Sequence, residues 1–236
     1  MRKWLIGLSV IAIFLMMGCT NIVNGDMTSS KDIIEKDGAK ELKVDLHLGA
    51  GEMVVTSGSN EWAEGAFEFS KPNMKPEVSY KLKGDTGHLD IEQPSTAHLT
   101  SIKEYKNKWD LYLTQEIPIS LNVKTGASEA ELHLSGLQLN ELGVDAGVGR
   151  TLIDLSGDWR QGFHAKINAG VGETELILPK STGVKLKIEN GIGDTNINGL
   201  ISKEDNVYVN DLYDSSEMKI EIDLKVGVGS IDVREE

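Results

Sequence analysis

Apolar and polar residues alternate along most of the chain after residue 41, and the alternation is organised around a recurring Gly-x-Gly motif. Small or apolar side chains lie one, three and five positions before the motif, as at Leu142 and Val144. Positions four, six and eight after its first glycine repeat a small, a large and a large residue, as at Thr151, Ile153 and Leu155. A period of two is typical of a β-strand with one buried face, and no window shows a comparable helical period. The sequence therefore predicts an all-β fold.

The motif, or a near copy of it, occurs six times, and the first glycines of the middle four copies are 21, 23 and 21 residues apart. A fixed period of this size indicates stacked units. We therefore predict a β-solenoid, in which parallel β-helix-like rungs of about 21 residues stack on one another, with extra N-terminal strands. Glycine at a corner permits positive φ and close approach of neighbouring coils. The predicted structural corner glycines are Gly49, Gly51, Gly126, Gly147, Gly149, Gly170, Gly172, Gly191, Gly193, Gly227 and Gly229.

Stacking in chain order makes a prediction about contacts between rungs. Ile153, Leu176 and Ile197 each lie six residues after a first glycine, so they are expected to touch along the axis. Ile167 and Ile188, three residues before their glycines, are expected to do the same. The alternative fold is an antiparallel β-sandwich, in which these residues would lie far apart.

Two long gaps interrupt the period. The first glycines of the first and second motifs are 77 residues apart, and those of the fifth and sixth motifs are 36 residues apart. Alternation within the first gap predicts additional strands, some of them antiparallel, at 66–69, 77–82, 88–92 and 109–113. Residues 94–107 and 201–217 are predicted to be loops, the second with a short strand at 206–210.

The N-terminus has the layout of a signal peptide. Arg2 and Lys3 precede a run of 14 uncharged residues at 4–17, which is shorter than a bilayer-spanning helix needs. Gly18 and Cys19 follow, and Cys19 is the only cysteine of the chain. This arrangement resembles the lipobox of bacterial lipoproteins, which implies cleavage before Cys19 and lipid attachment to its thiol.

These observations divide the chain into four segments. Residues 1–18 are expected to be the signal peptide, and 19–40, which are mostly polar, a lipid-anchored tether. Residues 41–120 are expected to form an N-terminal β region, and 121–236 the β-solenoid repeat region. The protein would then be held at the extracytoplasmic face of the cell membrane through the lipid on Cys19.

A family resemblance rests on the run VDLHLGAGE at 44–52, followed by KPEVSY at 75–80 and LDIEQP at 89–94. These segments resemble the toast-rack family of bacterial envelope proteins. The later Gly-Val-Gly rungs are similar to the extracytoplasmic domain of accessory proteins in cell-wall-antibiotic response systems. The resemblance spans about residues 41–233 and implies a role at the cell envelope.

The composition argues against several kinds of chemistry. The net charge of −13 makes nucleic acid an improbable partner, because phosphate binding needs a basic face. A single cysteine allows neither an internal disulfide nor a Cys-based zinc site, and the histidines lack metal-ligand spacing. Those histidines are His47, His88, His98, His133 and His164. The motif also lacks the third glycine of the dinucleotide fingerprint. We therefore expect no cofactor, no catalytic or metal-binding residues and no small-molecule ligand.

Two functions remain open for a non-enzymatic envelope protein. It is a scaffold, sensor or protein-interaction module, with an envelope protein as partner in a stress response, or it is a surface adhesin or glycan-binding module. The aromatic residues in insertions and turns either cap an end of the stack or form a binding patch. They are Trp62, Tyr105, Trp109, Tyr112, Trp159, Tyr208 and Tyr213.

Overall fold

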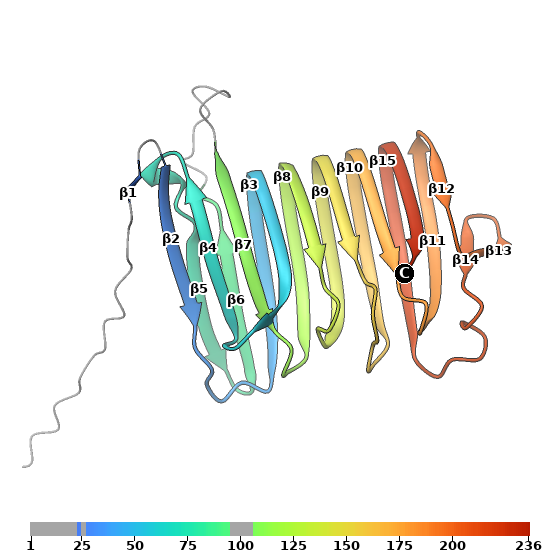
Figure 1. Cartoon of the computed structure of the whole chain (residues 1–236), viewed down its shortest axis with the longest axis horizontal. Helices are drawn as coiled ribbons and strands as arrows, with labels where there is room; N and C mark the ends of the chain where they lie inside the picture. The colour runs from blue at the N-terminus through green and yellow to red at the C-terminus, as the bar shows by residue number, and fades with distance from the viewer. Residues whose placement is uncertain (1–22, 25–26, 95–105) are drawn as a thin grey trace, which may run out of the picture.

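The computed structural model describes residues 23–24, 27–94 and 106–236, and this part of the chain is all-β, as predicted. A single short 3-10 turn, Pro72–Met74, interrupts the strands of the described residues. The strands join in one large mixed sheet that does not close on itself (Figure 1). Five long strands pass through a Gly-x-Gly motif or its near copy without a break, and a sixth ends within one. They are β3 (Glu41–Ser59), β8 (Ile119–His133), β9 (Leu139–Asp154), β10 (Phe163–Leu178), β15 (Lys219–Glu235) and β11 (Gly183–Ile192).

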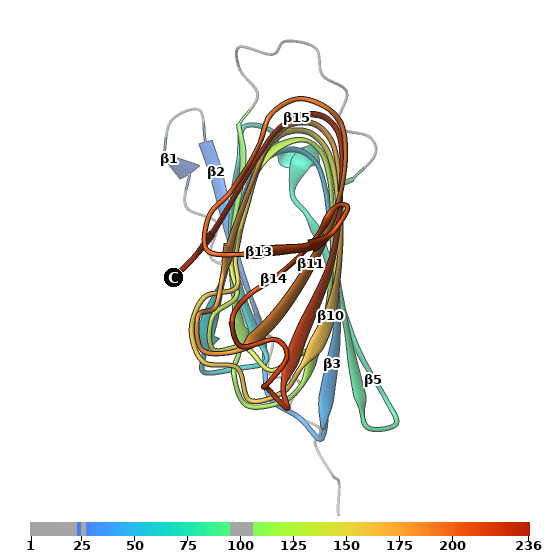
Figure 2. The ribbon, with the colours of Figure 1, turned by 90° about the vertical axis from the view of Figure 1, so that its right-hand side faces the viewer.

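Each long strand bends at its motif, so that the sheet folds into two walls that face one another. The end view shows the strands arching over at one edge (Figure 2). The residues before each motif form wall 1, and the residues after it form wall 2. The strands pair in parallel and in register through both walls, as Val44, Leu121 and Leu142 show for β3, β8 and β9. The predicted regions 41–120 and 121–236 are therefore continuous within one sheet.

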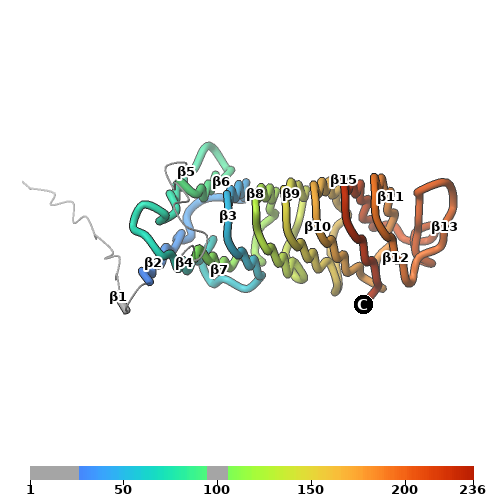
Figure 3. Tube along the Cα trace, turned by 90° about the horizontal axis from the view of Figure 1, so that it is seen from above, coloured from blue at the N-terminus to red at the C-terminus, as the bar shows by residue number. Residues whose placement is uncertain are grey.

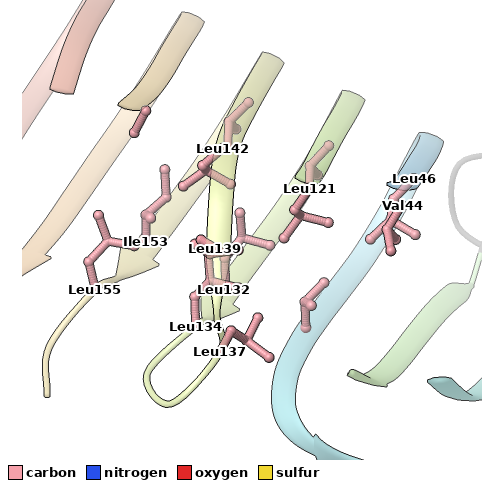
Figure 4. Close-up of a cluster of buried hydrophobic side chains, with 14 of the residues drawn as sticks. Val44, Leu46, Leu121, Leu132, Leu134, Leu137, Leu139, Leu142, Ile153 and Leu155 are labelled. Carbon is pink, nitrogen blue, oxygen red and sulfur yellow. The ribbon is translucent and has the colours of Figure 1, made fainter. Parts of the chain in front are cut away.

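The core fills the space between the walls (Figure 4). Leu121 and Leu142 from wall 1 and Leu132 and Ile153 from wall 2 are all buried and belong to one apolar cluster. Each such side chain contributes about 1.5–3 kcal/mol when it leaves water. Because one rung has no partner for its exposed backbone edge, this core forms only when several rungs stack.

The rungs do not stack in chain order, which corrects the predicted contacts. Strand β15, the last in the sequence, lies between β10 and β11 and pairs in parallel with both. Leu176 lies beside Ile153 as expected, but Val233 of β15 separates Leu176 from Ile197.

Wall 1 shows the same insertion. The expected neighbours Ile167 and Ile188 are both partners of Leu224 on β15 instead of each other. The repeat therefore identified the position of each residue within its rung, but not the order of the rungs.

Surface charge gives a physical reason for this order. In the register observed, Lys166 of β10 and Lys187 of β11 are both partners of Asp223 on β15. His164 and Lys185 are in the same way both partners of Glu221. Direct pairing of β10 with β11 would place Lys166 beside Lys187, and like charges side by side are destabilising across strands. The acidic residues of β15 separate them.

The N-terminal end is built from an interrupted rung and antiparallel strands. Strand β6 (Thr86–Glu92) pairs with the first half of β3 and β7 (Asn107–Thr114) with its second half, so together they form one more rung. Strand β5 (Glu77–Lys83) adds to wall 1, and β4 (Ala63–Phe69) to wall 2, both antiparallel. The additional strands predicted in the first gap are thus confirmed.

One prediction about this end is wrong. Residues 27–34, which lie within the predicted tether 19–40, form strand β2 (Met27–Ile34), which pairs with β4 over seven residues. A two-residue strand, β1 (Val23–Asn24), pairs with β2 in turn. Strand β2 lies near the edge of the sheet and carries Thr28, Ser29 and Ser30, so its alternation is too weak to stand out in the sequence.

At the C-terminal end, additional strands extend the sheet beyond β11 on wall 1 only. Strand β14 (Val207–Val209), at the predicted short strand, pairs with β11, and β13 (Ile201–Glu204) pairs with β14. The predicted loop 201–217 is therefore partly strand. On wall 2 the last strand is β12 (Thr195–Ile197), which pairs in parallel with β15. Seen from above, the rungs follow one another along the long axis between these two ends (Figure 3).

Candidate interaction surface

The corner glycines shape the edge where the two walls meet. The second glycine of the motif has a φ of +132° to +149° at Gly51, Gly149, Gly172, Gly193 and Gly229, a conformation that residues with a Cβ rarely adopt. A Cβ on Gly172 would lie 1.8 Å from the carbonyl oxygen of Gly149 on the neighbouring rung. The rungs therefore approach as closely as they do because these positions have no side chain.

The first glycine of each motif also allows neighbouring rungs to approach closely, although its φ is not positive. A Cβ on Gly126, Gly147, Gly170, Gly227 or Gly191 would lie 2.2–2.6 Å from the carbonyl oxygen of the first glycine on the next rung. At the interrupted rung, the side chains of Gln93 and Asn107 take the place of a corner. Gln93 accepts a hydrogen bond from the amide of Ala50 (3.0 Å), and Asn107 donates one to its carbonyl oxygen (2.9 Å).

A row of aliphatic side chains lies along the outside of these corners. It consists of the middle residues of the six motifs, which we call the corner ridge: in spatial order Ala50, Ala127, Val148, Val171, Val228 and Ile192. The four larger residues are 57%, 49%, 44% and 71% exposed in that order. Strands 4.8 Å apart give a ridge about 24 Å long. Single exposed aliphatic residues are ordinary, whereas an aligned row of them is typical of a binding surface.

Polar residues line both sides of the ridge. The first flank lies on wall 1, two residues before each motif: His47, Lys124, Asp145, Asn168, Lys225 and Glu189. The second flank lies on wall 2, one residue after each motif: Glu52, Glu129, Arg150, Glu173, Ser230 and Asp194. The ridge is thus an apolar strip between two rows of hydrogen-bonding and charged groups.

Ion pairs and hydrogen bonds hold many of these flanking side chains in place. Lys225 pairs with Glu189 at 2.7 Å, and its hydrogen bond lowers the pKa of the Glu189 carboxyl. Asn168 donates a hydrogen bond to Asp145 at 2.7 Å. Arg150 pairs with Glu175 at 3.0 Å, although a hydrogen bond from Arg234 is the main cause of the lowered pKa of Glu175.

A shallow depression of about 680 Å³ runs beside the ridge on wall 1. It is lined by small residues such as Ala146, Gly147 and Ala169 and by the charged residues Asp145 and Lys225. It is an open groove, and within the described part of the chain no group of three His, Cys, Asp or Glu side chains could hold a metal ion. The arrangement offers contact area, hydrogen bonds and charge to another surface.

The sequence-predicted site residues divide into two groups. All the predicted corner glycines lie at the bend between the walls, whereas Cys19 lies outside the described residues. The sequence analysis missed the corner ridge, although the middle residues of the motifs read Ala, Ala, Val, Val, Ile and Val in chain order. A hydrophobic residue flanked by two glycines was the available signal. The alternation on either side of each motif indicates the inward positions and gives no sign of the outward row.

The aromatic residues do not form one surface patch. The three tryptophans Trp62, Trp109 and Trp159 are buried, and Trp109 packs edge-on against Phe67 with ring centroids 5.6 Å apart. Tyr112 is exposed on wall 2 and Tyr213 is half-buried in the loop before β15, while Tyr105 lies outside the described residues. No helix in the described ranges is long and apolar enough to cross a bilayer.

Comparison with known proteins agrees with this architecture. A family model for the N-terminal domain of toast_rack matches residues 23–177, which is more than half of the chain. The chain belongs to the toast-rack family. A crystal structure of a candidate cell adhesion protein from Clostridium sporogenes is similar to this toast-rack protein, with 33% sequence identity and a TM-score of 0.85. The similarity covers 89% of this chain and 100% of that one.

More distant similarities add little to the description of this toast-rack protein. The structure of a candidate adhesin from Bacteroides fragilis matches with 13% identity over 88% of this chain and 98% of that one. Its TM-score is 0.36, which is too low to support an argument. No protein with a curated description matches the chain at a significant level.

Proposed function

We propose that this toast-rack protein is a non-enzymatic cell-envelope protein that is anchored by lipid on Cys19 and binds a protein partner through its corner ridge. The exposed row Val148, Val171, Val228 and Ile192 carries the proposal, because it places an apolar strip between two polar flanks. Interfaces that bind proteins combine an apolar centre with a polar rim in this way. We read the stacked, bent rungs as a short β-solenoid whose rigidity keeps the ridge straight.

The anchor follows from the N-terminal sequence. The uncharged run at 4–17 ends at Gly18 and Cys19, and cleavage there would leave residues 19–22 between the lipid and β1. Two or more acyl chains on Cys19 would hold the protein at the extracytoplasmic face, where one chain alone would not. In that position it would act as a scaffold or sensor, as in an envelope stress response.

Labelling with a radioactive fatty acid tests the anchor. The wild-type protein should incorporate label and fractionate with membranes, whereas Cys19→Ser should do neither. Equal labelling of the two proteins would contradict the lipid attachment.

Capture of membrane proteins after crosslinking tests the ridge. Val171→Lys places a charge in the middle of the strip and should reduce capture of the partner strongly. Leu212→Lys is the matched control, because Leu212 is an exposed residue of the loop between β14 and β15. Equal loss of capture in the two variants, or no loss in either, would contradict a role for the ridge.

A second candidate function is adhesion, which the similarity to the Clostridium sporogenes protein favours. The groove of about 680 Å³ beside the ridge would then take an extended polymer. Retention of the protein on purified cell-wall polymer, lost in Lys225→Glu but kept in Leu212→Lys, would support this function.

A further inference from the structure

We infer that the partner of the corner ridge is a second copy of the same chain, packed ridge against ridge with both copies running in the same direction. This inference rests on the proposed function for the location of the surface, and on the charges of its two flanks for the identity of the partner.

The geometry of such a pair follows from the shape of the ridge. A two-fold axis along the ridge keeps both chains parallel and places the first flank of each copy opposite the second flank of the other. Each rung then meets the same rung of its partner. The aliphatic row packs on itself, Val148 on Val148 and Val171 on Val171, in the self-complementary manner of a two-fold interface.

The two flanks are complementary in this arrangement. Lys124 of one copy faces Glu129 of the other, and Asp145 faces Arg150. Symmetry repeats each pair on the other side of the ridge. The remaining rungs place His47 opposite Glu52, Asn168 opposite Glu173, Lys225 opposite Ser230 and, as the one repulsive pair, Glu189 opposite Asp194. The groove beside the ridge provides room for the long side chains of the partner's second flank.

The antiparallel arrangement is less favourable. It places each flank opposite itself in reverse order, so that Lys124 faces Lys225 and Glu52 faces Asp194. Among the Lys, Arg, Asp and Glu side chains its one attractive pair is Arg150 with Glu173, and His47 faces Glu189 as it faces Glu52 in the parallel pair. Because like charges in contact disfavour a partner and opposite charges fix the register, the flanks select the parallel pair.

The size of the surface indicates how the pair forms. A strip about 24 Å long and about 15 Å wide offers about 360 Å² on each copy, less than half of the roughly 800 Å² of a stable interface. Such a contact is weak between free molecules. A common lipid surface raises the effective concentration of one copy near another. Figure 1 shows the first strands, β1 and β2, at one end of the long axis, so only the parallel pair places these strands of both copies at the same end, as suits two anchors in one membrane.

Single cysteines on the ridge test the inference in the full-length protein in membranes, with the Cys19 thiol blocked by lipid. Oxidation should crosslink Val148→Cys, Val171→Cys and Val228→Cys each to itself, as a dimer on a non-reducing gel. An antiparallel pair would instead join Val148→Cys to Val171→Cys when the two variants are mixed, and Val228→Cys would remain monomeric. Either that pattern or the absence of dimer in all three variants overturns the inference.

A charge exchange tests the register. Lys124→Glu and Glu129→Lys should each reduce the crosslinked fraction of Val171→Cys about fivefold, the effect of roughly 1 kcal/mol. The double variant Lys124→Glu, Glu129→Lys should restore it, which a mere change in folding would not do. Failure of the double variant to recover overturns the assigned register.

The outcomes separate this inference from the proposed function. If the ridge cysteines crosslink to a different protein and no homodimer forms, the second copy is wrong while the proposed function stands. If the wild type is unlabelled by fatty acid, the anchor is wrong. The ridge cysteines are then introduced into the Cys19→Ser variant and oxidised at high concentration in solution, where the crosslinking pattern still distinguishes the parallel from the antiparallel pair.

Discussion

Lys185 on β11 donates a hydrogen bond of 2.6 Å to Glu221 on β15, although the two residues are 36 positions apart in the sequence. The contact exists because the C-terminal strand is inserted before the end of the stack instead of added to it. Tyr213, in the loop that leads to β15, donates a second hydrogen bond to the same carboxylate at 2.8 Å. Glu221 thus joins two rungs and the connection between them.

The pair makes stability depend on pH at the acidic end. The hydrogen bonds from Lys185 and then Tyr213 lower the pKa of Glu221 below its usual 4.5. A lowered pKa in the folded state contributes stability that is complete above 4.5 and is lost as the pH falls through the folded pKa. Glu221→Gln should therefore lower stability at pH 7 by about 0.2–1 kcal/mol, because both side chains are partly exposed, and should have a smaller effect at pH 3.

Urea melts of the chain from residue 23 at the two pH values check this prediction. Glu217→Gln is the control, since Glu217 is an exposed carboxylate of the same loop. An effect of Glu221→Gln that is as large at pH 3 as at pH 7 would show that the ion pair is not its cause.

The inserted strand should also dominate the stability of the C-terminal half. Leu224 is buried between Ile167 and Ile188, so Leu224→Ala leaves a cavity that touches three rungs. We expect a loss of about 2–5 kcal/mol in the free energy of unfolding. The matched control Leu212→Ala, at an exposed position, should change it by less than about 0.5 kcal/mol. Equal losses in urea melts of the two variants would contradict the position of β15.

The sequence predicts a great deal of this fold because each rung repeats its own inward pattern. The alternation around Val144 and Ile153 specifies which side chains are buried, and the structure confirms both. The order of the rungs has no such local signature. Ile167 packs equally well beside Leu224 or Ile188, because all three are large, aliphatic and in the same slot. Only the outward charges distinguish the two orders, as Asp223 between Lys166 and Lys187 shows.

The N-terminal end shows a different limit. The sequence predicts a tether where strand β2 forms, because Thr28, Ser29 and Ser30 interrupt the alternation of that strand. The pairing of β2 is set by β4, whose paired residues lie 29 to 41 positions further along the chain. A strand whose stability comes from a distant partner and from backbone hydrogen bonds has little to mark it in its own sequence. The candidate site was accessible in the sequence, but the middle residues of the motifs gain meaning only once the rungs are aligned.

Asp37 should be a critical residue of the N-terminal end. It accepts hydrogen bonds from the indole of the buried Trp62 and from the hydroxyl of Tyr80, both at 2.9 Å. Burial and the bond to Asp37 raise the pKa of Tyr80 to about 12, while the bond from Trp62 lowers that of Asp37. Asp37→Ala leaves the indole donor without its partner, which should cost about 1–3 kcal/mol.

Tryptophan fluorescence during urea unfolding checks this cost. Asp37→Asn retains an acceptor and should lose less stability than Asp37→Ala. Asp158→Ala, at an exposed turn position, should have little effect. If Asp37→Asn and Asp37→Ala are equally destabilised, hydrogen bonding to the indole is not what holds this end together.

The corner glycines give the sharpest test of the stacking. Gly172 has a φ of +139°, and an added Cβ would lie 1.8 Å from the carbonyl oxygen of Gly149. Gly172→Ala must therefore strain the backbone and push two rungs apart, with a loss of at least about 2 kcal/mol, since a strained φ alone costs about 1–3. Gly38→Ala is the matched control, because its nearest contact would be Leu82 at 3.9 Å and its φ is not positive. That variant should change stability by less than about 0.5 kcal/mol. Thermal melts of both variants decide the matter, and a Gly172→Ala protein as stable as Gly38→Ala would mean that the rungs can separate at the ridge without cost.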